Sequence, residues 1–248
     1  MKKLMFAAAV AAGLVAIGDG LESSNTVGYN TADFTDKTMV CVGTPFFGVG
    51  ANAKFTLANF VATGFEYGSD ILQTIDPDTA DTIDSFTYLD PETYPTMAGW
   101  WYDDLSDSAD DIEFDAGQGF LGAFGGMCVG LQNAGEVSNS PMTFDYSGQT
   151  MVVVPNPIPR VMTLSEITAE GFEYGSDILQ TIDPDSADTV ESFTYLDPDT
   201  YPTMSGWWYD DLSDSAADVE IQPGEGMLGA FGSGCVELTF PAAVSSGN

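Results

Sequence analysis

The sequence of 248 residues contains no histidine, only five lysine and arginine residues and only three cysteines. Without histidine, the Ser–His and Cys–His pairs that activate serine and cysteine nucleophiles cannot form. A zinc site would also lack histidine, one of the usual zinc ligands, and the three cysteines are too far apart in sequence to form a zinc-binding motif. These absences exclude the His-dependent hydrolases and the His-ligated metal sites.

Acidic residues dominate the charged positions. There are 38 aspartates and glutamates, and the formal net charge is −33. Nucleic acids and anionic membrane surfaces are bound by cationic side chains that neutralise phosphate groups, so we expect neither as a partner. With so few cations in the chain, the carboxylates must be stabilised by hydration, by screening salt or by bound cations.

Two carboxylates would suffice for glycoside hydrolysis. However, nothing in the sequence singles out one pair among the 38 acids, and the duplication described below would imply two equal active sites. We therefore predict that the protein is not an enzyme.

Residues 1–20 have the features of a signal peptide. Lys2 and Lys3 precede an apolar stretch at residues 4–17 that is shorter than a membrane-spanning helix. Small residues at Ala16 and Gly18, or at Gly18 and Gly20, offer a cleavage site, and no second apolar run of spanning length follows. We expect a secreted, extracellular or cell-surface protein that does not insert into a membrane after cleavage. The alternative is a retained N-terminal membrane anchor.

A segment of the sequence occurs twice. Residues 64–129 return at 171–236 with a constant offset of 107 residues and no gap, and 52 of the 66 positions are identical. Near-identity over this length is the signature of a tandem repeat. The similarity extends upstream, where residues 38–42 correspond to 150–154 with an offset of 112 residues.

We predict one module at residues 22–135 and a second at 136–248, with no flexible linker between them. Within each module, runs rich in β-branched and aromatic residues are separated by Asp-Pro, Gly and Ser turns. The expected fold class is all-β, with two tandem homologous β-sandwich or barrel-like modules after the signal segment. The strands expected in the first module are 38–42, 70–75, 85–89, 100–102, 111–114, 119–124 and 127–132.

One short helix is expected at residues 163–166, because Thr163 and Glu166 have the spacing of a capping box. The corresponding residues of the first module, 56–59, end in Asn59 and lack the glutamate.

Acidic loops recur in both copies, with aspartates spaced two or three residues apart. Clustered carboxylates on a loop are ligands that calcium prefers, so calcium is the one candidate cofactor. The spacing is not that of an EF-hand, and a solvated acidic loop is the alternative. The candidate ligands are Asp76, Asp78, Asp81, Asp104, Asp107, Asp110, Asp183, Asp185, Asp188, Asp211 and Asp214.

The run Gly-Trp-Trp-Tyr also occupies the same place in both copies. Because successive side chains of a strand face opposite ways, we expect one tryptophan of each pair in the core and the other outside. The outer one could stack on a sugar ring or on a neighbouring subunit, while packing within or between modules is the alternative. These candidates are Trp100, Trp101, Trp207 and Trp208.

The three cysteines lie in a chain expected to be exported, where disulfides persist. Cys128 and Cys235 are equivalent in the repeat, and Val153 stands where Cys41 stands in the first module. If Cys41 and Cys128 are neighbours, they can form a disulfide. Cys235 would then be either a buried small side chain or a link between chains.

The repeated segment carries a pattern of glycine, acidic and aromatic positions. By this pattern, the chain resembles uncharacterised secreted tandem β-repeat proteins of the planctomycete–verrucomicrobial group of bacteria. The resemblance covers nearly all of the mature chain and implies secretion and a β-repeat fold, but no activity. The positions that carry it in the first copy are Gly64, Gly68, Ser69, Asp70, Gln73, Asp76, Gly99, Trp100, Asp111, Gly117, Gly119 and Leu121.

The C-terminal end of the second module, from Cys235 onward, resembles the internal junction that follows Cys128. The end of one chain could therefore dock on the start of another, and a head-to-tail contact that does not close generates a filament. Strand addition is the expected mechanism. We expect a secreted structural protein, a subunit of an extracellular filament or surface layer, whose partners are copies of itself. The alternative is a secreted, adhesin-like protein that binds carbohydrate or another surface ligand, with a glycan as partner.

Overall fold

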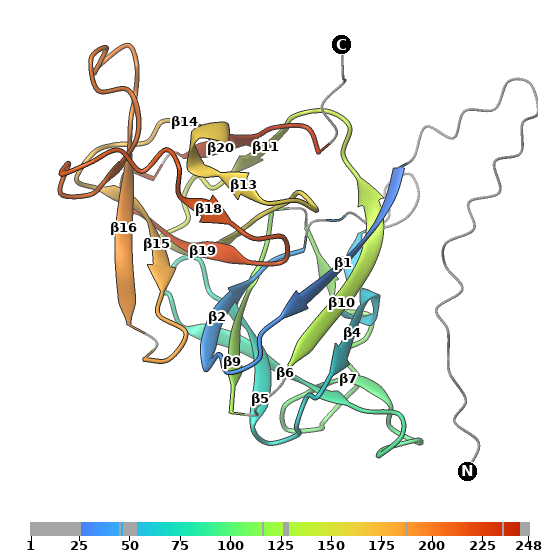
Figure 1. The fold of residues 1–248 in the computed structure, drawn as a ribbon. Coiled ribbons are helices and arrows are strands. Elements are labelled where there is room, and N and C mark those ends of the chain that lie inside the picture. The colour runs from blue at the N-terminus through green and yellow to red at the C-terminus, as the bar shows by residue number, and fades with distance from the viewer. Residues whose placement is uncertain are drawn as a thin grey trace, which may run out of the picture.

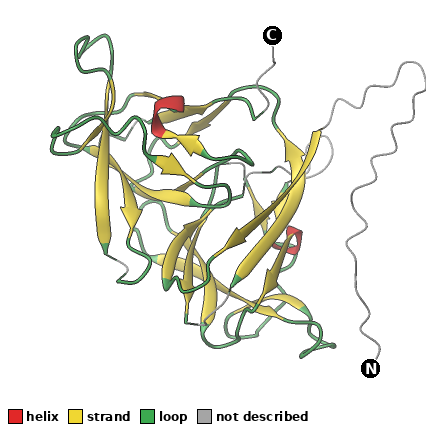
Figure 2. Ribbon diagram, in the orientation of Figure 1, coloured by secondary structure: helices red, strands yellow, loops and turns green. Residues whose placement is uncertain are grey.

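The computed structural model describes residues 26–44, 46, 54–115, 117–125, 129–186, 188–234 and 236–243. Over this part of the chain the fold is all-β, with twenty strands that pair only in antiparallel fashion and two single-turn 3-10 helices (Figures 1 and 2). The all-β prediction is confirmed. The signal segment expected at residues 1–20 lies outside the described residues.

Residues 26–137 form three sheets. Their strands are β1 (Thr26–Asp33), β2 (Met39–Val42), β3 (Phe55–Thr56), β4 (Phe60–Thr63), β5 (Asp70–Ile75), β6 (Thr82–Leu89), β7 (Gly99–Tyr102), β8 (Glu113–Phe114), β9 (Phe120–Phe124) and β10 (Gly130–Val137). The strand orders are β2-β9-β5-β6-β7, β1-β10-β4 and β3-β8.

Residues 142–240 form three more sheets. Their strands are β11 (Met142–Asp145), β12 (Met151–Pro155), β13 (Met162–Thr163), β14 (Thr168–Glu170), β15 (Asp177–Ile182), β16 (Thr189–Leu196), β17 (Gly206–Tyr209), β18 (Glu220–Ile221), β19 (Gly226–Phe231) and β20 (Glu237–Phe240). The orders β12-β19-β15-β16-β17, β11-β20-β14 and β13-β18 repeat those of the first half strand for strand. In Figure 1 the four larger sheets follow one another in a ring.

Each expected strand overlaps an observed one, and residues 70–75 match β5 at both ends. The helix expected at 163–166 is the 3-10 helix η2 (Leu164–Glu166), where the Glu166 carboxylate accepts the Thr163 N–H at 3.1 Å. The first half has the same turn, η1 (Leu57–Asn59). There the Asn59 Oδ1 accepts the Thr56 N–H at 2.8 Å, so a shorter side chain supplies the capping oxygen.

Each half surrounds its own hydrophobic core. One cluster of buried side chains comes from residues 32–137 and the other from 142–240, and Ala243 packs against both. Trp100 is fully buried in the first core, and its indole N–H donates to the Phe60 carbonyl of β4 at 2.9 Å. Because Trp100 belongs to β7, this bond ties the edge of the five-stranded sheet to the edge of the three-stranded sheet. Trp207 and Ile167 repeat it at 2.8 Å.

The two halves contact each other with approximate two-fold symmetry. The Thr38 N–H donates to the Pro184 carbonyl at 2.6 Å, and the Thr150 N–H donates to the Pro77 carbonyl at 2.5 Å. Thr38 is equivalent to Thr150, and Pro77 is equivalent to Pro184. In each half, the residue just before β2 or β12 therefore contacts the Asp-Pro turn of the other half. A contact in which both partners use the same surface is isologous.

Glycines permit the close approach of the halves at equivalent places. A Cβ added to Gly117, whose φ is +85°, would lie 2.6 Å from the Phe144 ring of the other half. At the equivalent Gly224, with φ +84°, a Cβ would lie 2.8 Å from Ala32 Cβ. An isologous contact uses the same surface of both partners, so it closes between the two halves and leaves no copy of that surface for another chain.

Candidate functional site

The structure assigns local roles to the candidate calcium ligands. The Asp76 carboxylate accepts the N–H of Asp78 at 2.8 Å and of Thr79 at 3.1 Å, and its equivalent Asp183 accepts the same two bonds. These are Asx turns, in which the carboxylate holds its own loop. Among the residues that the structure describes, no group of three or more acidic, Cys or His side chains lies close enough to hold a metal. Calcium binding stays a prediction.

The second acidic loop, residues 103–111, folds back along the outer edge of β7. The Ala109 N–H donates to the Trp100 carbonyl at 2.8 Å, and the Trp100 N–H donates to the Asp110 carboxylate at 2.8 Å. In the second half Ala216 and Trp207 repeat the first bond at 3.0 Å, while Ala217 stands in place of Asp110. Since the loop satisfies groups that an exposed edge would offer to another chain, it protects both edges from strand addition.

Raising the NaCl concentration is expected to raise the melting temperature by several degrees, because it screens repulsion among the 38 carboxylates. The Debye length falls from about 30 Å at about 0.01 M salt to about 3 Å at about 1 M. Thermal unfolding followed by circular dichroism measures the effect, and a melting temperature independent of NaCl would contradict this explanation.

A calcium site predicts a further effect. At equal ionic strength, CaCl2 should raise the melting temperature above that in MgCl2, and the rise should saturate. Identical curves would rule the site out.

The tryptophan pairs have one inner and one outer member, as alternation along a strand requires. Trp100 and Trp207 lie in the cores and are closed to any ligand, whereas Trp101 and Trp208 are half-buried. The Trp101 indole N–H donates to the Met97 carbonyl at 2.7 Å. The outer tryptophan of the first half therefore supports the loop of residues 90–98 that leads into β7.

Cys41 is a free and buried thiol on β2. Burial first, and then the charge of Glu225, raise the pKa of this thiol to about 12, so it is held in the unreactive protonated form. Cys128, its expected disulfide partner, and Cys235 lie outside the described residues.

A cavity of about 330 Å³ lies between the two halves, and we call it the open crevice. Its wall from the first half comes from the ends of β5 and β8 and the loop between β8 and β9. Its wall from the second half comes from β11, β12 and the turn between them. Tyr146 is buried in it, and its hydroxyl donates to the Gly117 carbonyl at 2.9 Å. Its lining includes Thr74, Pro77, Phe114, Asp115, Gln118, Phe144, Asp145, Tyr146 and Gln149.

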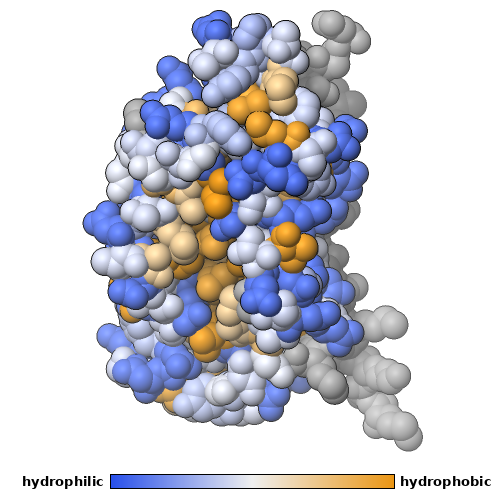
Figure 3. All heavy atoms as spheres, turned by 90° about the vertical axis from the view of Figure 1, so that its left-hand side faces the viewer, coloured by the Kyte–Doolittle hydropathy of each residue, from blue (hydrophilic) through white to orange (hydrophobic). Residues whose placement is uncertain are grey.

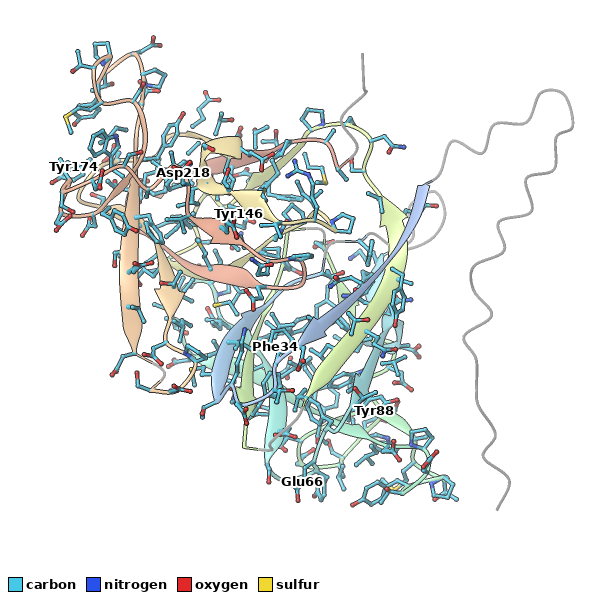
Figure 4. The ribbon with its side chains drawn as sticks, in the orientation of Figure 1. Phe34, Glu66, Tyr88, Tyr146, Tyr174 and Asp218 are labelled. Atoms are coloured by element: carbon cyan, nitrogen blue, oxygen red, sulfur yellow. The ribbon has the colours of Figure 1, made fainter. Side chains whose placement is uncertain are left out.

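The two-fold symmetry produces an equivalent place on the other side of the contact, which we call the filled crevice. There Lys37 Nζ lies 2.5 Å from the Glu225 carboxylate and 5.6 Å from the centre of the Phe34 ring. Phe34 and Tyr146 are equivalent residues. In Figure 4 both lie in the interior of the view, whereas Tyr174 lies at the margin of the molecule. The sequence did not indicate either crevice, because each is assembled from residues of both halves.

Comparisons with known proteins gave no match. No protein family, no curated protein and no solved structure is significantly similar to the chain. The resemblance to secreted bacterial β-repeat proteins therefore stays a prediction. Within the described part of the chain, none of the helices has the length and apolar character needed to cross a membrane.

Proposed function

We propose that the protein is a secreted structural protein made of two tandem homologous β-modules, and that it assembles end to end into an extracellular filament or surface layer. The observation that supports this proposal is the isologous contact between the halves. Two-fold symmetry directs two copies of one surface away from the contact, so each molecule presents the same surface at both ends.

Exposed apolar side chains mark these two surfaces. Six of the nine large apolar side chains that are exposed among the described residues occur in equivalent pairs: Tyr67 and Tyr174, Ile83 and Val190, and Tyr94 and Tyr201. The loops that follow β6 and β16 carry Tyr94 and Tyr201 and project at opposite corners of the molecule in Figure 1. Figure 3 views the side on which β16 lies, and apolar residues form a broken stripe there between hydrophilic margins. Apolar surface of this kind favours contact with another protein.

The assembly differs from the head-to-tail arrangement that the sequence suggested. A copy of the internal contact cannot propagate, because both halves already use that surface on each other. A second isologous contact between the outer ends can propagate, since alternating two different two-fold contacts produces an open chain. The expected repeat unit of such a filament is one whole molecule.

Variants of the two outer loops test this proposal. Negative-stain electron microscopy of the purified mature protein is expected to show fibres for the wild type. The single variant Tyr201→Ser should stop at dimers, because one end is blocked, and the double variant Tyr94→Ser with Tyr201→Ser should stay monomeric. The control is Tyr29→Ser, which removes a tyrosine that is 63% exposed on β1 and away from the outer loops. Monomeric wild-type protein at high concentration, or fibres of the double variant, would refute end-to-end assembly.

The second candidate function is the binding of a carbohydrate or another surface ligand. The open crevice favours it, because a concave site lined by aromatic rings with a few polar groups is the usual form of a ligand pocket. Screening the wild-type protein on a glycan array tests this alternative, and binding there by dispersed monomers would favour it over assembly.

A further inference from the structure

The two crevices between the halves are equivalent by symmetry but are lined by different side chains. In the filled crevice the chain itself supplies an ammonium group, that of Lys37, to the Glu225 carboxylate. In the open crevice Gln149 and Gln118 stand at the positions of Lys37 and Glu225. No lysine or arginine is among the residues that line the cavity. The open crevice thus lacks the ion pair of the filled crevice, and the cavity lies in its place.

Carboxylates remain at the open crevice. Asp145 is equivalent to Asp33, which lies near Lys37 in the filled crevice. Hydrogen bonds from Ser147 lower the pKa of Asp145, so this side chain is negatively charged at neutral pH. In the loop between β8 and β9, Asp115 stands where the second half has Gln222, and Gln118 stands where it has Glu225. The acidic residue is therefore kept, but at the other of the two positions. The site therefore keeps two acidic side chains.

Aromatic rings provide the apolar part of the same site. Tyr146 stands where Phe34 lies under the Lys37 ammonium group, and Phe144 adds a ring where the filled crevice has Ala32. Aromatic faces attract cations, with Arg and Lys groups found within about 6 Å of the ring centre. An ammonium group on a short apolar stem matches both the rings and the carboxylates.

The described cations of the chain are already engaged, and one of them, Lys54, is paired with Asp115 of the open crevice itself. Lys54 lies 3.5 Å from Glu113 and 3.4 Å from Asp115, both exposed pairs at the surface. Arg160 forms an ion pair with Glu166 at 2.6 Å. Among the described residues, no lysine or arginine is paired with Asp145, the other carboxylate of the open crevice. A cation from another molecule can take this place, and the net charge of −33 favours its approach.

We infer that the open crevice binds a primary alkylammonium group, from a free amine or from a lysine side chain of another protein, at the place that Lys37 occupies in the filled crevice. The cavity volume of about 330 Å³ is at the lower end of the range for ligand sites, about 300–1,000 Å³, and so suits a ligand of this size. This inference does not depend on the proposed assembly, because the crevice lies at the internal contact and not at the outer ends.

Isothermal titration calorimetry of the mature wild-type protein tests the inference with three probes. These are Nα-acetyl-lysine N-methylamide, n-pentylamine and the neutral Nα-acetyl-norleucine N-methylamide. Both amines are expected to bind at one site per chain, about ten-fold or more tighter than the neutral probe, and more weakly as NaCl is added. Binding of the lysine probe alone would identify a peptide lysine as the source, and equal binding of pentylamine would identify a free amine.

Variants designed from the filled crevice provide the controls. Gln149→Lys combined with Gln118→Glu reproduces the pair of Lys37 and Glu225, and it should abolish amine binding by filling the cavity. Asp145→Asn should weaken binding about ten-fold and leave the protein folded, since Asp145 is exposed and the asparagine oxygen can still accept the Ser147 N–H. Conversely, Lys37→Gln with Glu225→Gln should open the filled crevice and raise the stoichiometry from one to two.

Three results would overturn the inference. The neutral probe could bind as tightly as the amines, which would point to an apolar or sugar-like ligand. The variant with Gln149→Lys and Gln118→Glu could keep the wild-type affinity, which would place the binding elsewhere. The amines could also fail to bind a wild-type protein whose unfolding curve shows that it is folded.

Discussion

Trp207→Ala is expected to lower the free energy of unfolding by about 3–5 kcal/mol, the range for removing a large buried aromatic side chain. Trp207 is 2% exposed, and its ring centre lies 5.2 Å from that of Tyr195 and 5.4 Å from that of Phe172. Its indole N–H also donates to the Ile167 carbonyl at 2.8 Å. The alanine variant therefore loses packing within the core and the bond from β17 to the residue just before β14. Urea denaturation measures the change.

Two further variants separate these contributions. Trp207→Phe keeps most of the packing but leaves the Ile167 carbonyl without its donor, which should cost about 1–3 kcal/mol. Trp208→Ala removes the neighbouring half-buried ring from the opposite face of β17 and should cost about 1 kcal/mol. If Trp208→Ala proved as damaging as Trp207→Ala, the assignment of inner and outer faces would be wrong.

The sequence predicted the elements whose signals are local. β5 and β6 are rich in β-branched and aromatic residues and are bounded by Asp-Pro turns, so their existence follows from composition alone. The turns at Asp76 and Asp183 also follow, because the aspartate binds amides only two and three residues ahead. The constant offset between the copies then predicts the second set of elements from the first.

Strands with weak local signals were missed. β1 has the sequence TVGYNTAD, and β10 continues from the predicted end at residue 132 to Val137 through NAGEV. Glycine, asparagine and aspartate disfavour strands in isolation. These two segments are strands because they pair with each other over eight residues, from Thr26 with Val137 to Asp33 with Gly130. A contact so distant in sequence leaves no periodic signal in either segment.

The candidate site was beyond sequence reasoning for a related reason. Asp115, Gln118 and Gln149 occur at unremarkable loop positions, and only the two-fold contact brings the loops of the two halves to one cavity. The acidic loops gave a stronger signal than the crevice, but the structure uses some of their carboxylates, such as those of Asp76 and Asp110, to hold a turn and to cover a sheet edge. The repeat alignment does show that Gln149 replaces Lys37 and that Gln118 replaces Glu225. The sequence alone does not show that Lys37 and Glu225 contact each other, so it gives no reason to connect the two replacements.

Gly117→Ala is expected to cost about 2–5 kcal/mol, because it damages the contact between the halves as well as the local backbone. With φ at +85°, any Cβ at this position adopts a left-handed conformation, which costs about 1–2 kcal/mol. The new methyl group would also lie 2.6 Å from the Phe144 ring. Overpacking of this kind adds about 1–3 kcal/mol to the cost. Equilibrium unfolding in urea, followed by tryptophan fluorescence, measures the sum.

Gly68→Ala is the matched control, because Gly68 has nearly the same φ, +84°, with no atom within 4 Å of an added Cβ. It should show the backbone cost alone, so the difference between the two variants isolates the clash at the contact. Since Phe144 also lines the open crevice, Gly117→Ala should in addition weaken amine binding while Gly68→Ala leaves it unchanged. Equal destabilisation by the two variants would mean that the halves do not press together at Gly117. In that case the isologous contact, on which the end-to-end assembly depends, would have to be abandoned.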